Sequence, residues 1–170
     1  MYPLDPNLVI PAQSQISHWA YYRLLMTLNY RNPAVLFITL LGIGALIGPL
    51  GLLGFPVLSL ATFFAGYALL FPLVIYFQSL RSYRVTKFLQ EVVHYEFTPV
   101  QISVRGVSFE SALRWTSLYQ VVELKTWFLL YSTHITAFFV PKASFASAED
   151  QKQFKNIIIA TPGIRKEINP

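Results

Sequence analysis

A long stretch without charged side chains constrains this chain more than any other feature. No Asp, Glu, Lys, Arg or His occurs between Asn32 and Leu80. A helix needs about 20 apolar residues to cross a bilayer, and a charge at its centre costs about 2.5 to 3.5 kcal/mol on insertion scales. Helix-breaking residues at Gly48-Pro49 and Gly54-Phe55-Pro56 divide the stretch near its middle. We therefore expect a transmembrane hairpin over residues 32–80, with spans at about 33–53 and 56–77.

The net charge of +5 is unevenly distributed. No acidic residue occurs between Asp5 and Glu91, and the cations of that interval flank the uncharged stretch: Arg23, Arg31, Arg81, Arg84 and Lys87. Because basic residues favour the cytoplasmic side of membrane spans, we expect a multi-pass protein with both termini in the cytoplasm. A nucleic-acid-binding protein would carry the excess on its soluble surface, so nucleic acid is not an expected partner.

After Lys87 the pattern changes to an alternation of apolar and polar residues, which is typical of β-strands. Six strands are expected, at Val93–Thr98, Ile102–Arg105, Phe109–Trp115, Val121–Thr126, Trp127–Ser132 and Thr136–Val140. These strands predict a small antiparallel β-barrel or sandwich. The whole chain is then an α+β membrane protein, with a cytoplasmic domain over residues 88–160.

A helix is expected to close this domain. Ser147, followed by acidic residues at Glu149 and Asp150, resembles a capped helix start. The apolar stripe of this helix is predicted to face the core through Phe154, Ile157 and Ile158. The helix should end near Thr161, and residues 161–170 are expected to form a flexible, frayed tail.

Residues 1–31 are expected to form a strand and an amphipathic helix. Leu8–Ile10 is a short β-prone run before Pro11, and the apolar spacing of Ser14–Tyr30 predicts a helix. This helix is either interfacial or the early start of the first span, with a bend at Asn32-Pro33. The first eleven residues contain no Lys or Arg, so we expect no signal peptide.

Four segments of the soluble region share a pattern with a known family: Val93–Thr98, Leu113–Glu123, Phe128–Tyr131 and Phe138–Phe145. Over about residues 93–159 the chain resembles the YcxB-like family of bacterial membrane proteins. It implies an N-terminal strand and helix, a transmembrane hairpin and a pleckstrin-homology-like domain at the bacterial inner membrane. Such a domain needs one strand more than the six counted, so Leu8–Ile10 is expected to join it. The departure at Pro99-Val100 affects the first hairpin.

No residue pattern indicates catalysis. The chain has no Cys, and its three histidines (His18, His94 and His134) do not lie at metal-ligand spacing. No nucleophile–base pattern or phosphate-binding loop is evident, and the resemblance implies no catalytic residue. We therefore expect a protein that is not an enzyme and that uses no metal and no cofactor.

Three groups of residues are candidates for binding. The first anchors the hairpin or forms a lipid-headgroup site: Arg81, Arg84, Lys87 and Lys142. The second packs the hairpin helices or a dimer: Gly44, Gly48, Ala61 and Ala65. The third lies either in the domain core or in a patch for a partner: Trp115, Tyr119 and Trp127.

We therefore expect a non-enzymatic integral membrane protein whose cytoplasmic pleckstrin-homology-like domain binds a partner protein or a lipid headgroup. The expected partners are membrane lipid and either another protein or a second copy of the chain. The alternative is an oligomerising subunit of a transport or membrane complex. The absence of ionisable groups from the uncharged stretch argues against a transport role.

Overall fold

The computed structural model describes residues 8–52, 56–134 and 136–168; between residues 43 and 60, only residues 44 and 45 have described surroundings. The chain divides into two compact units. The β unit combines the residues up to Gln15 with those from Glu91 onward, and the helical unit is Ile16–Gln90. The described residues form four α-helices and two sheets, which confirms the α+β class.

Sheet A of the β unit has four antiparallel strands in the order β1-β2-β3-β4. Its strands are β1 (Ile10–Gln15), β2 (Val92–Phe97), β3 (Gln101–Arg105) and β4 (Glu110–Arg114). β1 pairs with β2 from Ile10 opposite Phe97 to Gln15 opposite Val92. The expected pairing of Leu8–Ile10 with the domain is thus confirmed at Ile10, whereas Leu8 and Val9 precede the strand. The strand continues through Pro11, which an edge strand tolerates, and includes Ser14 and Gln15, which were expected to be helical.

Sheet B has the order β7-β6-β5-β8. Its strands are β5 (Gln120–Glu123), β6 (Trp127–Tyr131), β7 (Ala137–Pro141) and β8 (Arg165–Glu167). β8 pairs in parallel with β5, whereas the other pairs are antiparallel. The sequence predicts a frayed tail where β8 forms. All three side chains of β8 are exposed and therefore carry no alternation that would reveal a strand.

The two sheets do not close into a barrel, which corrects that part of the prediction. Ala12 and Phe145 form an isolated bridge near the edge strand β1, but no continuous ladder joins the sheets among the described residues. Strand alternation predicts the strands themselves but not which edges pair. The domain is therefore two sheets over a shared core.

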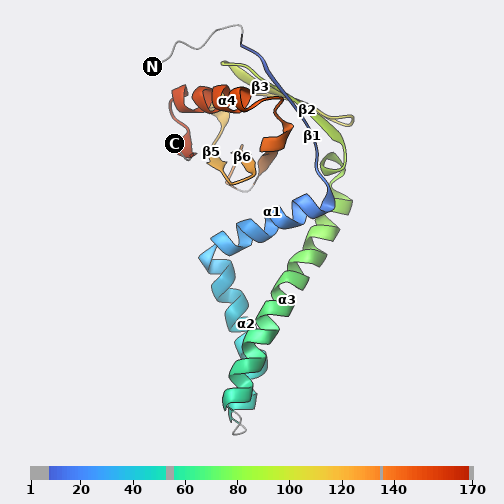
Figure 1. Cartoon of the computed structure of the whole chain (residues 1–170), viewed down its shortest axis with the longest axis vertical. Helices are drawn as coiled ribbons and strands as arrows, with labels where there is room; N and C mark the ends of the chain where they lie inside the picture. Colours follow the sequence, from blue (N-terminus) through green and yellow to red (C-terminus); the bar gives the residue numbers. More distant parts are fainter. Residues whose placement is uncertain (1–7, 53–55, 135, 169–170) are drawn as a thin grey trace. The chain divides into compact units, whose positions relative to one another are not determined.

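The core of the β unit is rich in aromatic side chains and includes residues of the helix α4 (Ala148–Ala160), which is labelled in Figure 1. The Ser147 hydroxyl accepts a hydrogen bond from the Asp150 amide at 3.0 Å and caps α4 as expected. Phe154 is fully buried, with its ring centroid 4.6 Å from that of Phe97 and 4.9 Å from that of Phe128. The predicted inward stripe of this helix is confirmed at all three positions: Phe154, Ile157 and Ile158.

Short 3₁₀ turns connect several elements: η1 (Lys87–Leu89), η2 (Trp115–Ser117) and η3 (Lys142–Ser144). The β2–β3 hairpin forms despite Pro99-Val100. Thr98 and Gln101 close it with a backbone hydrogen bond of 3.0 Å, and the Thr98 hydroxyl accepts another from the Gln101 amide.

The helical unit contains α1 (His18–Arg31), α2 (Pro33–Leu52) and α3 (Pro56–Val85). Ser17 caps α1 by accepting from the Ala20 amide, so this helix begins later than the expected Ser14. α1 and the first part of α2 meet at 88°, and α2 then runs beside α3 (Figure 1). Among the described residues, the stretch Ala61–Val85 is long and apolar enough to cross a membrane, judged by length and composition alone. When α1 and residues 33–42 are taken together as one bent span, they also pass this test.

Candidate functional site

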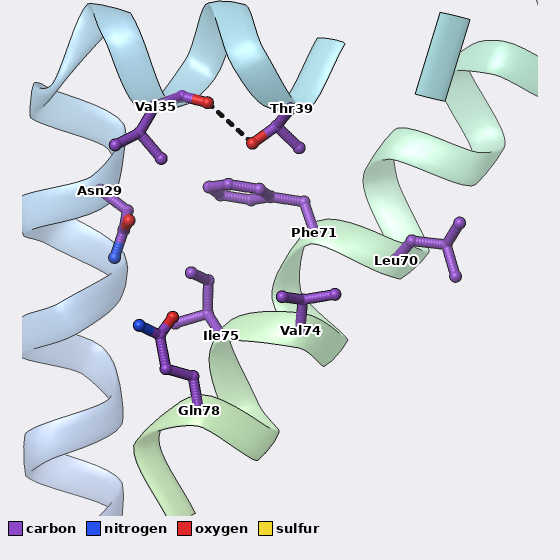
Figure 2. A pocket seen from close by; sticks show the side chains of 8 residues that line it. All are labelled: Asn29, Val35, Thr39, Leu70, Phe71, Val74, Ile75 and Gln78. Carbon is purple, nitrogen blue, oxygen red and sulfur yellow. Dashed lines mark hydrogen bonds between the residues drawn. The ribbon is translucent and has the colours of Figure 1, made fainter. Parts of the chain in front are cut away.

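A pocket of 490 Å³ lies among the three helices of the helical unit. Figure 2 shows its lining side chains, which come from all three helices: Asn29, Val35, Thr39, Leu70, Phe71, Val74, Ile75 and Gln78. A volume of this size is within the range of small-molecule sites. The walls are almost entirely apolar, and only Asn29, Thr39 and Gln78 add polar groups.

The polar groups of this helical pocket are not equally available. The Thr39 hydroxyl donates to the Val35 carbonyl at 2.7 Å, as the dashed line in Figure 2 shows. The Asn29 amide nitrogen donates to the Leu25 carbonyl at 2.8 Å. The Gln78 side chain makes no hydrogen bond to any other residue that the structure describes. Both N–H groups of Gln78 are therefore available to a ligand, whereas one of the two N–H groups of Asn29 is already used.

Hydrogen bonds between polar groups hold α1 and the residues before it against α3, two of the helices that form the pocket. The hydroxyl of the fully buried Ser79 donates to the Tyr76 carbonyl at 2.7 Å and lies 3.1 Å from His18 Nε2. Because the hydroxyl proton is already used, His18 Nε2 must be the donor of the second hydrogen bond. The Tyr83 hydroxyl donates to the Ile16 carbonyl at 2.9 Å, and the Tyr21 and Ser82 hydroxyls lie 3.1 Å apart.

The four candidate headgroup cations fall in two different units. The side chains of Arg81, Arg84 and Lys87 are exposed on the last turns of α3 and on η1. Lys142 belongs to the β unit, where its ammonium lies 2.5 Å from a Glu123 carboxylate oxygen and 5.0 Å from the centre of the Phe128 ring. Lys142 is therefore held within the domain and is not a free surface cation.

Glu123 is the centre of a buried charge cluster that the sequence analysis did not identify. Its side chain is only 5% exposed and also pairs with Lys155 of α4 at 3.2 Å. Burial raises the pKa of this carboxyl, but the hydrogen bonds and charges of Lys142 and Lys155 outweigh burial, so the net pKa is lowered. The cluster joins β5, η3 and α4. Because both ammonium groups pair with one carboxylate, we interpret the cluster as stabilising the fold of the β unit.

The aromatic candidates do not form one surface. Trp115 is 2% exposed and donates through its indole nitrogen to the Thr98 carbonyl at 2.7 Å, and Trp127 is also buried. Tyr119 is 44% exposed, and the Arg165 guanidinium lies 5.7 Å from its ring centre. Of the three, the structure places the two tryptophans in the interior and leaves Tyr119 at the surface.

The small-residue candidates also separate. A Cβ added at Gly44 would lie 3.5 Å from the Phe63 ring, so Gly44 packs against α3 within the chain. Ala61 and Ala65 are exposed. Gly48 lies within α2, but its surroundings are outside the described part of the chain.

The β unit has a shallower groove of 280 Å³ beside β1 and β2. Its polar side chains include Gln13, His94 and Glu96. Burial raises the pKa of Tyr95, on the same strand, to about 12. Within residues 8–52, 56–134 and 136–168, no three His, Asp or Glu side chains gather in a way that would hold a metal ion.

Comparison with known proteins gives one match. Residues 98–158 match the model of the YcxB-like protein family, so the chain is similar to that family over this segment. This confirms the resemblance inferred from the residues of the β unit. No curated protein and no solved structure matches the chain.

The helical pocket was missed by sequence reasoning because its walls come from three helices that are distant in sequence. One signal was present. Asn29 and Gln78 are amides that lie just before and just inside the two ends of the uncharged stretch, where apolar residues otherwise dominate. Amides at the edges of an apolar segment are candidates for contact with a polar group of a ligand.

Proposed function

We propose that this chain is a non-enzymatic, membrane-anchored binding protein of the bacterial inner membrane. The helices α2 and α3 form the anchor, and the β unit is a pleckstrin-homology-like module on the cytoplasmic side. The observation that carries the proposal is the exposure of large apolar side chains on these two helices, including Phe37 at 62%, Ile38 at 68% and Leu69 at 72%. Contiguous apolar surface of this kind marks a membrane or protein contact.

The strand pairing supports an even number of crossings. Gln15 lies opposite Val92 in sheet A, and the whole helical unit connects these two residues. A single crossing would put β1 and β2 on opposite sides of a bilayer and prevent their pairing. Trp19, Tyr22 and Tyr76 form an aromatic cluster with ring centroids 5.5 to 6.2 Å apart. Because Trp and Tyr favour the headgroup level of a bilayer, this cluster supports a position of α1 at that level.

For the β unit, a protein partner is the better-supported ligand. Lys142, the one headgroup candidate in this unit, forms an ion pair with Glu123. The groove beside β1 presents polar side chains of Gln13, His94 and Glu96, to which a protein partner can hydrogen-bond. The cations Arg81, Arg84 and Lys87 then attract anionic headgroups as part of the anchor.

Labelling of single cysteines tests the topology. The chain has no native Cys, so Leu52→Cys and Ser147→Cys each introduce a unique thiol. With a membrane-impermeant maleimide, Leu52→Cys should react in intact cells and Ser147→Cys only after the cells are permeabilised. Reaction of Ser147→Cys in intact cells to the same extent would overturn the proposed orientation. Loss of the protein from carbonate-washed membranes would overturn the anchor itself.

Self-association through α3 is the second candidate. It is favoured by the exposure of Ala61 and Ala65, which lie one turn apart. Replacing both by Leu should reduce cross-linking between copies in the membrane if this face is a dimer contact. Phe77→Ala is the control and should not reduce it, because Phe77 is exposed on a different side of the same helix.

A further inference from the structure

We propose that the helical pocket holds one acyl chain of a membrane phospholipid, with the chain's ester carbonyl at Gln78. This inference rests on the proposed membrane anchor and names a ligand for the anchor region. The pocket is bounded by α1, α2 and α3, all within the helical unit.

The order of residues along α3 matches the order of groups in a phospholipid. Leu70, Val74 and Gln78 line the pocket at four-residue intervals and so follow one face of the helix. Arg81, three residues beyond Gln78, is exposed on the next turn. Since an α-helix rises about 1.5 Å per residue, the apolar wall from Leu70 extends about 12 Å along the axis to Gln78, and the Arg81 guanidinium follows about 4.5 Å further on. An acyl chain, its ester and its phosphate follow the same order.

The chemistry of the walls favours an acyl chain as the occupant. Phe71 and Ile75 are 3% and 4% exposed and form an apolar floor. Water does not fill apolar cavities stably, and an empty pocket would forfeit dispersion contacts along its lining. Leu70 and Val74 are themselves 43% and 60% exposed, so the pocket is continuous with the apolar surface that the proposed function places in lipid. A neighbouring lipid chain therefore has direct access.

The polar group of the ligand is assigned to a neutral carbonyl. No Lys or Arg is among the pocket-lining residues that the structure describes, so a buried carboxylate would lack a counter-charge. The Thr39 hydroxyl and one of the two Asn29 amide N–H groups already donate to backbone carbonyls. Gln78 retains amide N–H groups that can donate to an ester carbonyl. A phosphate beyond the ester would then meet Arg81.

Phospholipid retention by the full-length protein tests this assignment. The protein is reconstituted in vesicles of phosphatidylethanolamine and phosphatidylglycerol, re-extracted in mild detergent and assayed for phosphorus per chain. Wild type should retain one phospholipid. Leu70→Trp, which fills the pocket, should lower retention about tenfold, equivalent to about 1.4 kcal/mol. Leu69→Trp is the matched control, because Leu69 is 72% exposed and does not line the pocket, and it should retain the lipid.

The role of Gln78 is tested with an ether-linked phospholipid, which lacks the ester carbonyl. Wild type should retain the ester lipid about threefold to tenfold better than the ether lipid, the range expected for one hydrogen bond. Gln78→Leu should retain both equally. Because this variant keeps the apolar walls, it tests the assignment even if Leu70→Trp fails to fold. An equal preference in wild type would overturn the ester contact.

The outcomes separate this inference from the proposed function. If wild type stays in carbonate-washed membranes but retains no more phospholipid than Leu70→Trp, the acyl-chain site is wrong and the anchor stands. If wild type leaves the membrane and also retains no lipid, both are wrong. If it leaves the membrane but retains one phospholipid that Leu70→Trp loses, the site stands and the anchor is wrong.

Discussion

The ammonium nitrogen of Lys155 on α4 lies 3.2 Å from a carboxylate oxygen of Glu123 on β5. In the sequence, Lys155 looks like an outward cation whose charge reversal should leave the fold intact, as expected also of Lys152. The structure separates the two residues. Lys152 is exposed, whereas Lys155 is only 24% exposed and helps neutralise a buried carboxylate.

Lys155→Glu should therefore destabilise the β unit. It replaces an attractive pair by two carboxylates beside each other, and disruption of a buried pair costs about 3 to 5 kcal/mol. Lys152→Glu is the matched control and should change stability by less than about 0.5 kcal/mol. Urea unfolding of the full chain, followed by the near-ultraviolet signal of the buried Trp115 and Trp127, measures both. Equal stability of the two variants would contradict the pairing.

Acid should weaken the β unit through Glu123. Its pKa is lowered in the folded chain relative to the ordinary value of 4.5, so the folded state holds its proton less tightly than the unfolded state. The stabilisation is present above pH 4.5 and is lost as the pH falls from there through the folded-state pKa. Glu123→Gln should reduce this acid dependence of the midpoint of urea unfolding. An unchanged slope below that pH would assign the effect to other carboxylates.

The N-terminal strand should be required for the stability of the β unit. Ile10 is 1% exposed in β1 and belongs to the core, whereas its neighbour Val9 is 54% exposed. Ile10→Ala should cost about 2 to 5 kcal/mol, the range for a large-to-small change in a core. Val9→Ala should cost less than about 0.5 kcal/mol. Both values come from urea unfolding, and a similar loss in the two variants would argue that β1 is not a core strand.

The basic flank should contribute to association with anionic lipid. Replacing Arg81, Arg84 and Lys87 by Gln should weaken association with phosphatidylglycerol-containing mixed micelles by about 1 kcal/mol per cation and flatten its salt dependence. The fluorescence of the exposed Trp19 reports the association. Lys125→Gln combined with Lys152→Gln is the control, because both lysines are exposed in the β unit. If the flank variant keeps its affinity and its partner protein, the flank is not an anchor.

The features that depend on a few neighbouring residues could be predicted from the sequence. Ser147 caps its helix, Phe154 faces the core, and Ile10 joins the domain, because capping and apolar periodicity act over a few residues. The sequence did not predict the pairing of sheet edges, since alternation is the same in a barrel and in two open sheets. The sequence also does not reveal that Lys142 and Lys155 are paired, because their partner Glu123 is 19 and 32 residues away.

The aromatic residues show a related limit. Four successive residues of β6, Trp127–Leu130, are all buried, so alternation cannot indicate which side faces the interior.

The helical pocket depends on Phe71 of α3 and Val35 of α2 meeting near Asn29 of α1. This contact requires the 88° turn between α1 and α2, and periodicity within each helix contains no information about that angle.

The pairing of Ile10 with Phe97 has a consequence for biosynthesis. β1 is translated before the three helices of Ile16–Gln90, whereas its partner β2 is translated after them. Until then the exposed edge of β1 is available to a chaperone or to another nascent chain. Completion of sheet A is thus a late event, and a truncated translation product that stops within α3 should remain a substrate for proteolysis.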